Sequence, residues 1–301
     1  MVVRYALLVI AGMALQFFWG DVDASFLSYP WTICVAMSYL YILILLYAKS
    51  DSVKCLRRLY DRPAMLTTLM SMLVLTLLFG LIRQDGSTEG VWGWLGFTRM
   101  TSSWIFVLFL VHFMTVIGLK AVEDVYRWKQ RKLPAVVMHV SFFVILASAV
   151  LGSGEKVRVR VITTLEAPVH IGVTQDRKMY GLPFTLTLKE FVLEEYPPQV
   201  VVVDGEEMLM PRREVRKFMS RVSVADEEGT REVEILVNHP ARIGAWRIYQ
   251  SGYDSARGKE STISILECVK DGWYPMIHIA MWMILLGGVM MFFVGHKKKK
   301  V

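Results

Sequence analysis

Three histidines lie inside long apolar stretches of this sequence, and they are the side chains best suited to chemistry. His112, His139 and His278 each occur in a run that carries no charged residue. Ionisable or metal-binding side chains within lipid-spanning helices are costly, and they usually face the interior of a helix bundle. An imidazole there either ligates a metal, such as a haem iron, or donates a hydrogen bond to a neighbouring helix. The histidines are therefore candidate haem ligands, with a structural hydrogen bond as the alternative.

The spacing of the histidines predicts where they lie in depth. His139 follows the start of its run at Leu133 by six residues, and His112 precedes Lys120 by eight. At 1.5 Å per residue these positions are about 9 Å and about 12 Å from the same side of the membrane. A short loop joins the two runs, so an axial pair of both histidines on one haem iron is geometrically possible if they face the same cleft. His278 lies near the opposite, outer end of the last run. Any role of His278 is therefore expected at a second, outer site or at the membrane interface.

The elements that position these histidines are predicted to be transmembrane helices. Of 301 residues, 54% are hydrophobic, and they gather in charge-free runs. Such runs need about 18 residues to span a bilayer as a helix. Six runs are expected to do so: residues 5–20, 24–48, 64–82, 100–119, 133–154 and 273–295. The first is the shortest and resembles the apolar part of a signal peptide, but it lacks a cleavage site, so we interpret it as a retained helix.

Basic loops predict the orientation of these helices, because Lys and Arg mark the cytoplasmic side. The basic residues are Lys49, Lys54, Arg57, Arg58 and Arg62 in one loop, and Lys120, Arg127, Lys129, Arg131 and Lys132 in the other. The tail 297–300 is also basic. We therefore expect both termini in the cytoplasm and the segment 155–271 outside. The net charge of +7 then anchors the chain in the lipid bilayer, and nucleic-acid binding is excluded.

Residues 155–271 have the alternating pattern of a β-rich domain inserted before the last helix. The expected strands are residues 156–164, 184–193, 199–203, 221–225, 232–237, 246–250 and 262–266. The acidic turn 226–229 separates two of them in the manner of a hairpin. The simplest fold for this domain is a compact antiparallel sandwich.

The sequence predicts no catalytic residue. It contains no Gly-x-Ser-x-Gly elbow, no phosphate-binding glycine loop and no His-Glu-x-x-His. Of the three cysteines, Cys34 falls in a helix, Cys55 in a basic loop and Cys268 in the outer domain, so no disulfide within the outer domain is expected. The absence of Cys-x-x-Cys-His means that the chain itself does not carry c-type haem.

Several separated motifs make the chain resemble the ResB/CcsB family of cytochrome c biogenesis proteins, in particular the short form found in Bacteroidetes. The motifs are LGFTRMTSSW at 95–104, His139 with AVLGS at 149–153, EYPP at 195–198, WRIYQSGYD at 246–254 and VKDGWYP at 269–275. Their order and topology match over roughly residues 60–295. The first two helices match only generally.

This resemblance implies a subunit of the system II cytochrome c synthetase in the bacterial inner membrane, with its large domain in the periplasm. Such a subunit handles haem b transiently across the membrane and supports its attachment to apocytochrome c. It does so with a CcsA-type membrane subunit, so this chain is expected not to be catalytic alone. His139 matches the transmembrane histidine thought to ligate the haem iron in the family.

The chain departs from the family pattern around His278, where relatives tend to have a tyrosine, and after Asp271, where they tend to have a proline. A pair of His112 with His139 departs from it too, because the usual second ligand lies on the CcsA-type subunit. Two other functions compete with haem delivery. One is a membrane subunit that holds b-type haem permanently for electron transfer, and the other is a haem-free assembly scaffold.

Overall fold

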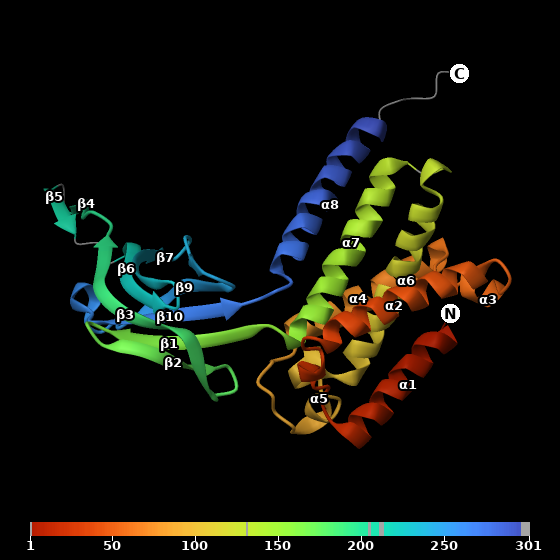
Figure 1. Ribbon diagram of the computed structural model, residues 1–301, viewed down its shortest axis with the longest axis horizontal. Coiled ribbons are helices and arrows are strands. Elements are labelled where there is room, and N and C mark those ends of the chain that lie inside the picture. Colours follow the sequence, from red (N-terminus) through yellow and green to blue (C-terminus); the bar gives the residue numbers. More distant parts are fainter. Residues whose placement is uncertain (1, 131, 204–205, 211–213, 296–301) are drawn as a thin grey trace. The chain divides into compact units, whose positions relative to one another are not determined.

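The computed structural model describes residues 2–130, 132–203, 206–210 and 214–295, and the predicted basic tail 297–300 lies outside them. The chain forms two compact units. A helical unit comprises Met1–Glu155 and Trp273–Val301, and a β unit comprises Lys156–Gly272. Figure 1 labels the helices of the first unit and the strands of the second.

The long helices of the helical unit follow the predicted apolar runs. They are α1 (Val2–Trp19), α2 (Trp31–Ser50), α4 (Arg62–Leu81), α6 (Trp104–Tyr126), α7 (Leu133–Leu151) and α8 (Tyr274–Gly295). The shorter helices are α3 (Lys54–Arg57) and α5 (Gly90–Trp94). Within the described chain, five helices are long and apolar enough to cross a membrane, and α1 is shorter, with an apolar part at Val3–Trp19. The chain thus has the composition of a membrane protein.

Helix α6 is the centre of the helical unit. It packs against α1, α2, α4 and α7, and α8 packs against α7 (Figure 1). Val116 and Leu119 on α6 are completely or almost completely buried. Gly118 allows a close approach, because a Cβ atom there would lie 2.6 Å from Cδ1 of Leu43 on α2. Close packing of this kind fixes the rotation of α6 and hence the direction in which its polar residues point.

The predicted end of this helix at residue 119 is wrong, because α6 continues to Tyr126. The basic loop 120–132 is therefore shorter than expected. Lys120 stays within the helix because its ammonium group lies 2.6 Å from Glu123 and 3.0 Å from Asp124, one turn further on. Ion pairs at these spacings lie on one face of a helix and stabilise it, so a run of charges does not end the helix.

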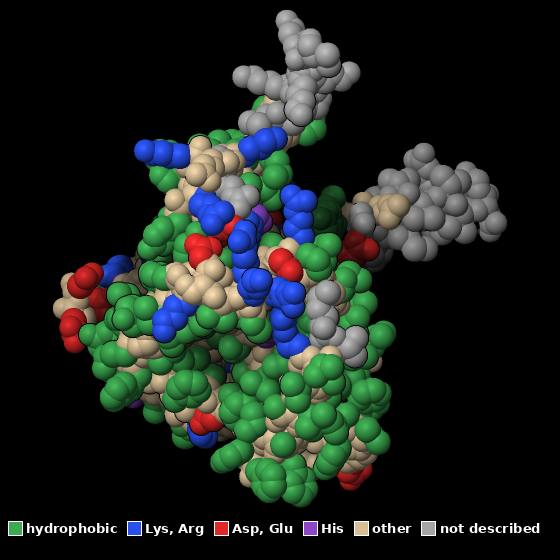
Figure 2. Space-filling model, turned by 90° about the vertical axis from the view of Figure 1, so that its right-hand side faces the viewer, with side chains coloured by type: hydrophobic (Ala, Val, Ile, Leu, Met, Phe, Trp, Pro, Cys, Tyr) green, Lys and Arg blue, Asp and Glu red, His purple; other side chains and the backbone are tan. Residues whose placement is uncertain are grey.

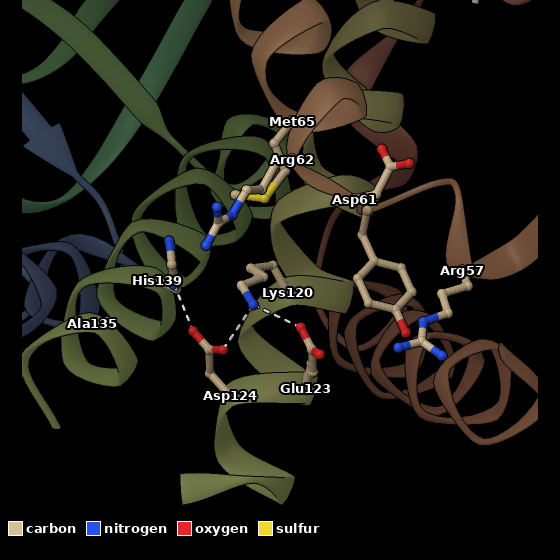
Figure 3. Close-up of a pocket in the computed structure, with 10 residues that line it drawn as sticks. Arg57, Asp61, Arg62, Met65, Lys120, Glu123, Asp124, Ala135 and His139 are labelled. Atoms are coloured by element: carbon tan, nitrogen blue, oxygen red, sulfur yellow. Dashed lines mark hydrogen bonds and ion pairs between the residues drawn. The ribbon is translucent and has the colours of Figure 1, made fainter. Parts of the chain in front are cut away.

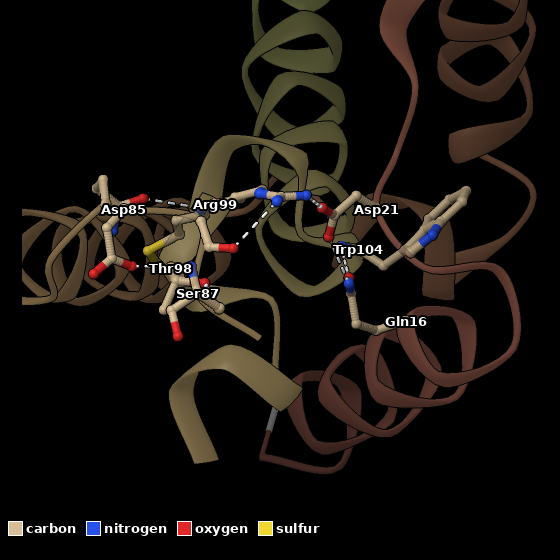
Figure 4. Close-up of polar contacts among 10 residues, drawn as sticks. Gln16, Asp21, Asp85, Ser87, Thr98, Arg99 and Trp104 are labelled. Carbon is tan, nitrogen blue, oxygen red and sulfur yellow. Dashed lines mark hydrogen bonds and ion pairs between the residues drawn. The ribbon is translucent and has the colours of Figure 1, made fainter. Parts of the chain in front are cut away.

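Polar contacts fix the segment that enters α6, at the end of the bundle away from Tyr126 (Figure 4). Arg99 donates to Asp21 at 3.1 Å and to the carbonyl oxygen of Gly86 at 3.1 Å. Gln16 on α1 donates to Asp21 at 2.8 Å and accepts from the backbone N–H of Trp104 at 3.0 Å. The motif 95–104 thus ties the start of α6 to the end of α1.

In the described residues, the β unit contains ten strands, which pair antiparallel. They are β1 (Val157–Thr164), β2 (Pro168–Thr174), β3 (Met179–Glu195), β4 (Gln199–Val203), β5 (Glu206–Met210), β6 (Val215–Asp226), β7 (Gly229–Leu236), β8 (Ala241–Ile243), β9 (Trp246–Tyr253) and β10 (Ile263–Lys270). Eight of them form one sheet in the order β7-β6-β3-β2-β1-β10-β9-β8, and β4 pairs with β5. The all-β prediction is correct, although β2, β5 and β8 were not expected.

The predicted sandwich of two sheets is replaced by one sheet that curls until it is nearly closed. The edge strands β7 and β8 are consecutive in the chain, β7 contacts both β8 and β9, and Leu236 at the end of β7 forms an isolated bridge with His239 just before β8. Strand β3 is long and changes register at Leu188 and again at Glu194. Such bulges increase twist and bend a strand, which lets a single sheet enclose its own core.

The inward side of this sheet forms the core of the β unit. Val159, Leu186, Val222 and Leu266 have no exposed surface and come from four different strands. The motif 246–254 forms β9, in which Trp246 and Ile248 are buried in the same core. These motif residues therefore have a packing role.

Candidate functional site

A cavity of about 410 Å³ opens among α3, α4, α6 and α7 at one end of the helical unit (Figure 3). Its lining residues are Arg57, Tyr60, Asp61, Arg62, Met65, Lys120, Glu123, Asp124, Ala135 and His139. Besides Tyr60, seven of these ten residues have ionisable side chains: three are basic, three are acidic and one is a histidine. A volume of this size is at the small end of the range for small-molecule pockets.

His139 is held in this cavity by Asp124. Its Nδ1 atom lies 2.6 Å from Oδ2 of Asp124, and since a carboxylate only accepts, the imidazole N–H donates. The Asp124 side chain is 2% exposed and the His139 side chain is 30% exposed. Helix α7 places His139 in its second turn, after Pro134 near the helix start, where proline is favoured. Among the described residues, the second ring nitrogen of His139 has no hydrogen-bond partner, and His139 lines the cavity.

Lys120 and Glu123 complete the group around Asp124. Lys120 donates to Glu123 at 2.6 Å and lies 3.0 Å from Asp124, so both carboxylates share its charge. Asp124 thereby stays oriented between the ammonium group of Lys120 and the imidazole of His139 (Figure 3). A histidine whose outer nitrogen is free and whose other N–H donates to a carboxylate has the arrangement common in metal-ligating histidines.

The opposite wall of the cavity is the turn between α3 and α4. Tyr60 is 8% exposed, and its hydroxyl group lies 2.9 Å from the hydroxyl group of Ser50. Asp61 caps α4, because its carboxylate accepts from the backbone N–H of Ala64 at 2.9 Å. Arg62 follows as the first residue of the helix, and Figure 3 shows its side chain reaching into the space in front of His139.

Figure 2 shows Lys and Arg side chains gathered on one face of the molecule, with hydrophobic side chains around them.

His112 does not line this cavity, so the structure does not bring together the possible pair of His112 and His139. Its ring lies 5.9 Å from the ring of Tyr5 on α1, and its Nε2 atom lies 3.5 Å from the hydroxyl group of Thr68 on α4. It precedes Asp124, the partner of His139, by twelve residues on the same helix, which is about 18 Å along the axis. The similar depths expected for His112 and His139 assumed that the helix of His112 ends at residue 119. Because α6 continues to Tyr126, His112 lies further from the end of its helix than expected.

His278 lies far from the cavity, in the second turn of α8. It is exposed, and its ring lies 4.0 Å from the ring of Tyr274. Gly287, nine residues later, is level with α7 residue Met138, since a Cβ atom there would lie 2.8 Å from Cγ of Met138. His278 is thus about 14 Å along α8 from the level of His139. The structure brings none of the three histidines together.

Sequence reasoning missed Asp124, Lys120, Arg57 and Arg62 as cavity residues, because all four fell in predicted loops. The signal for Asp124 is its spacing of four from Lys120, which suits an ion pair on a continued helix. No sequence signal indicates that α3 and α4 face α7 across the cavity. Among the residues that the structure describes, no group of three or more His, Cys, Asp or Glu side chains is placed to hold a metal ion.

The comparisons with known proteins bear on the segment that includes His139. The family described as the ResB-like family matches residues 129–272, which cover α7 and the whole β unit. A solved structure of cytochrome c heme lyase CcmF is similar with 13% identity and a TM-score of 0.33, covering 73% of this chain. This chain spans only 34% of that protein, and the likeness establishes neither a common fold nor a common activity. No curated protein matches the chain. The family match confirms, over residues 129–272, the resemblance to the ResB family that the motifs indicate.

Proposed function

We propose that this chain is a haem-handling subunit of a system II cytochrome c synthetase. It would hold haem b transiently during transfer across the bacterial inner membrane and support attachment to apocytochrome c at the outer face. The match to the ResB-like family over residues 129–272 supports a role in cytochrome c biogenesis. The geometry of His139 supports the haem-handling part of this proposal.

The observation that carries the proposal is the contact of 2.6 Å between His139 and Asp124 at the wall of a cavity. Imidazole is a common axial ligand of haem iron. Because Asp124 accepts the Nδ1 proton, the lone pair on Nε2 is the one available to a metal. The carboxylate also raises the basicity of the imidazole and restricts rotation of the ring. The residues present therefore fit a haem iron at His139.

The chain supplies one protein ligand at this cavity, which agrees with the need for a partner. We expect a CcsA-type membrane subunit to provide the second axial ligand and the outer site at which apocytochrome c reacts. Haem supplies the vinyl groups to which apocytochrome thiols are joined. This chain contributes the binding and orientation of haem, and we propose no catalytic residue in it.

An absorption spectrum with haem quantification tests the proposal. The full chain, co-expressed with a CcsA-type subunit and purified in detergent, is compared with His139→Ala with and without added imidazole. We expect the variant to lose haem and to regain it with imidazole, because imidazole replaces the missing ligand. His112→Ala serves as the matched control, since His112 lies in the same helical unit but outside the cavity.

The two competing functions give different results. A permanent electron-transfer subunit needs pairs of ligands for tightly held haem, and His112 contacts Tyr5 and Thr68 instead of facing His139. Stoichiometric haem in His139→Ala would remove His139 from the site. Absence of haem from both the wild-type complex and the variant would favour a haem-free scaffold.

A further inference from the structure

Two arginines line the cavity opposite His139 without a carboxylate partner. Arg57 ends α3 and Arg62 begins α4, and both border the same cavity as His139. Within the part of the chain that the structure describes, neither guanidinium group forms an ion pair or a side-chain hydrogen bond. Both arginines are exposed, and their N–H donors are unpaired and available to a group that fills the cavity.

The acidic residues of the cavity are engaged elsewhere. Asp61 accepts from the backbone N–H of Ala64, and Glu123 accepts from Lys120. Asp124 lies between Lys120 and His139. The formal charges of the lining cancel, but the carboxylates are bound to neighbouring groups and the two guanidinium groups are not. The side of the cavity formed by α3 and α4 is therefore suited to an anion.

The shape of guanidinium and the end of α4 favour a carboxylate in particular. A guanidinium group presents a planar fork of N–H donors that matches the two oxygens of a carboxylate. Arg62 is also the first residue of a helix of 20 residues, and a helix N-terminus favours negative charge. The cavity thus offers an imidazole on one wall and carboxylate-binding groups on the other.

We propose that Arg57 and Arg62 bind the two propionate carboxylates of the haem whose iron His139 ligates. This inference rests on the proposed function and adds which groups of the haem the chain recognises, namely the two propionates. Haem is a flat molecule with an iron at its centre and two carboxylates on one edge. Ligation by His139 and ion pairing by the arginines would hold it by its centre and its edge, which fixes its orientation in the cavity.

Three related compounds separate the two kinds of contact. Haem has both the iron and the carboxylates, haem dimethyl ester has the iron with neutral esters, and protoporphyrin IX has the carboxylates without the iron. The full chain, in complex with a CcsA-type subunit in lipid nanodiscs, is titrated with each compound, by absorption for the first two and by fluorescence for the third. Empty nanodiscs measure binding to lipid alone.

The double variant Arg57→Gln, Arg62→Gln is the test, and Arg58→Gln is its matched control. Arg58 adjoins Arg57 and carries the same charge, but it does not line the cavity. We expect the double variant to bind haem and protoporphyrin IX at least about tenfold more weakly, as expected for lost charge-assisted hydrogen bonds. Its affinity for haem dimethyl ester and the affinities of Arg58→Gln should stay unchanged.

The outcomes distinguish this inference from the proposed function. Equal weakening for haem and its dimethyl ester, or no weakening for either, would overturn the role of the arginines while leaving His139 as a ligand. Similar losses of affinity in Arg58→Gln would show that only the net positive charge of this region matters. That result would also overturn the role of Arg57 and Arg62. Unaltered haem absorption in His139→Ala would contradict the proposed function. Absence of binding by the wild type to all three compounds would overturn both.

Discussion

His139 and Asp124 lie 15 positions apart in the sequence, and their side chains meet at 2.6 Å across two antiparallel helices. The carboxylate is almost completely buried, while the imidazole reaches the cavity. Asp124 is thus a positioning residue, which acts on any bound metal only through His139. This relationship gives the most direct prediction.

Replacement of Asp124 should change the electronic properties of haem bound at His139. The carboxylate gives the imidazole more anionic character, which stabilises ferric over ferrous iron. We expect Asp124→Asn to raise the midpoint potential of the bound haem, measured by a spectroscopic redox titration of the complex. Glu123→Gln is the control, because Glu123 pairs with Lys120 and does not contact His139. Equal potentials in Asp124→Asn and wild type would contradict this role.

Gly154, just after α7, should tolerate no side chain. A Cβ atom there would lie 2.5 Å from the carbonyl oxygen of Leu27, which belongs to the backbone and cannot rotate away. We expect Gly154→Ala to destabilise the helical unit by about 1–3 kcal/mol, a typical cost of overpacking. Thermal denaturation followed by size-exclusion chromatography in detergent measures the effect.

Gly80→Ala is the control for this substitution. Gly80 lies in α4, and a Cβ atom there would meet nothing within 4 Å. Alanine favours a helix more than glycine does, so this variant should be at least as stable as the wild type. If both variants denatured at the same temperature, the close contact of Gly154 would not limit stability.

Cys268 should be unreactive in the folded β unit. It is completely buried in the sheet core, and burial, with a smaller contribution from the charge of Glu267, raises the pKa of its thiol from 9.0 to about 12. In the background Cys34→Ser, Cys55→Ser, a thiol reagent at pH 8 should label the chain only after denaturation. Rapid labelling of the folded protein would contradict the burial of Cys268.

The same thiol makes stability depend on pH in a defined direction. The raised pKa means that the unfolded chain loses this proton at a lower pH than the folded chain. The contribution of Cys268 to stability is therefore complete below about pH 9 and is lost as the pH rises from 9 towards 12. From pH 9 towards pH 12, the free energy of unfolding should therefore fall more steeply for the wild type than for Cys268→Ala. An identical pH dependence of the two proteins would show that Cys268 does not contribute.

The orientation predicted from the basic loops needs its own measurement. In the Cys34→Ser, Cys55→Ser background, Glu228→Cys places a thiol on the exposed turn between β6 and β7, and Ser52→Cys places one between α2 and α3. A membrane-impermeant maleimide should label Glu228→Cys in intact spheroplasts. It should label Ser52→Cys only after the membrane is opened. The reverse pattern would place the β unit in the cytoplasm.

The sequence by itself determined the class of the protein and the most promising histidine. Charge-free runs of about 20 residues form helices suited to lipid because every backbone group must be paired within the segment. The alternating pattern of residues 155–271 similarly indicated a β unit. An imidazole inside an apolar run is costly unless it has a partner, which made all three histidines candidates. His139 stood out among them because it matches the transmembrane histidine of the family that the motifs resemble.

Only the tertiary structure decided which residues meet. The charges of Lys120, Glu123 and Asp124 were read as a loop, although ion pairs keep them within α6 and bring Asp124 to His139. The rotation of α6, fixed by packing against four helices, turns His112 towards Tyr5 and Thr68. Contacts between helices depend on packing over the whole bundle, whereas the period of a sequence reports only one helix at a time.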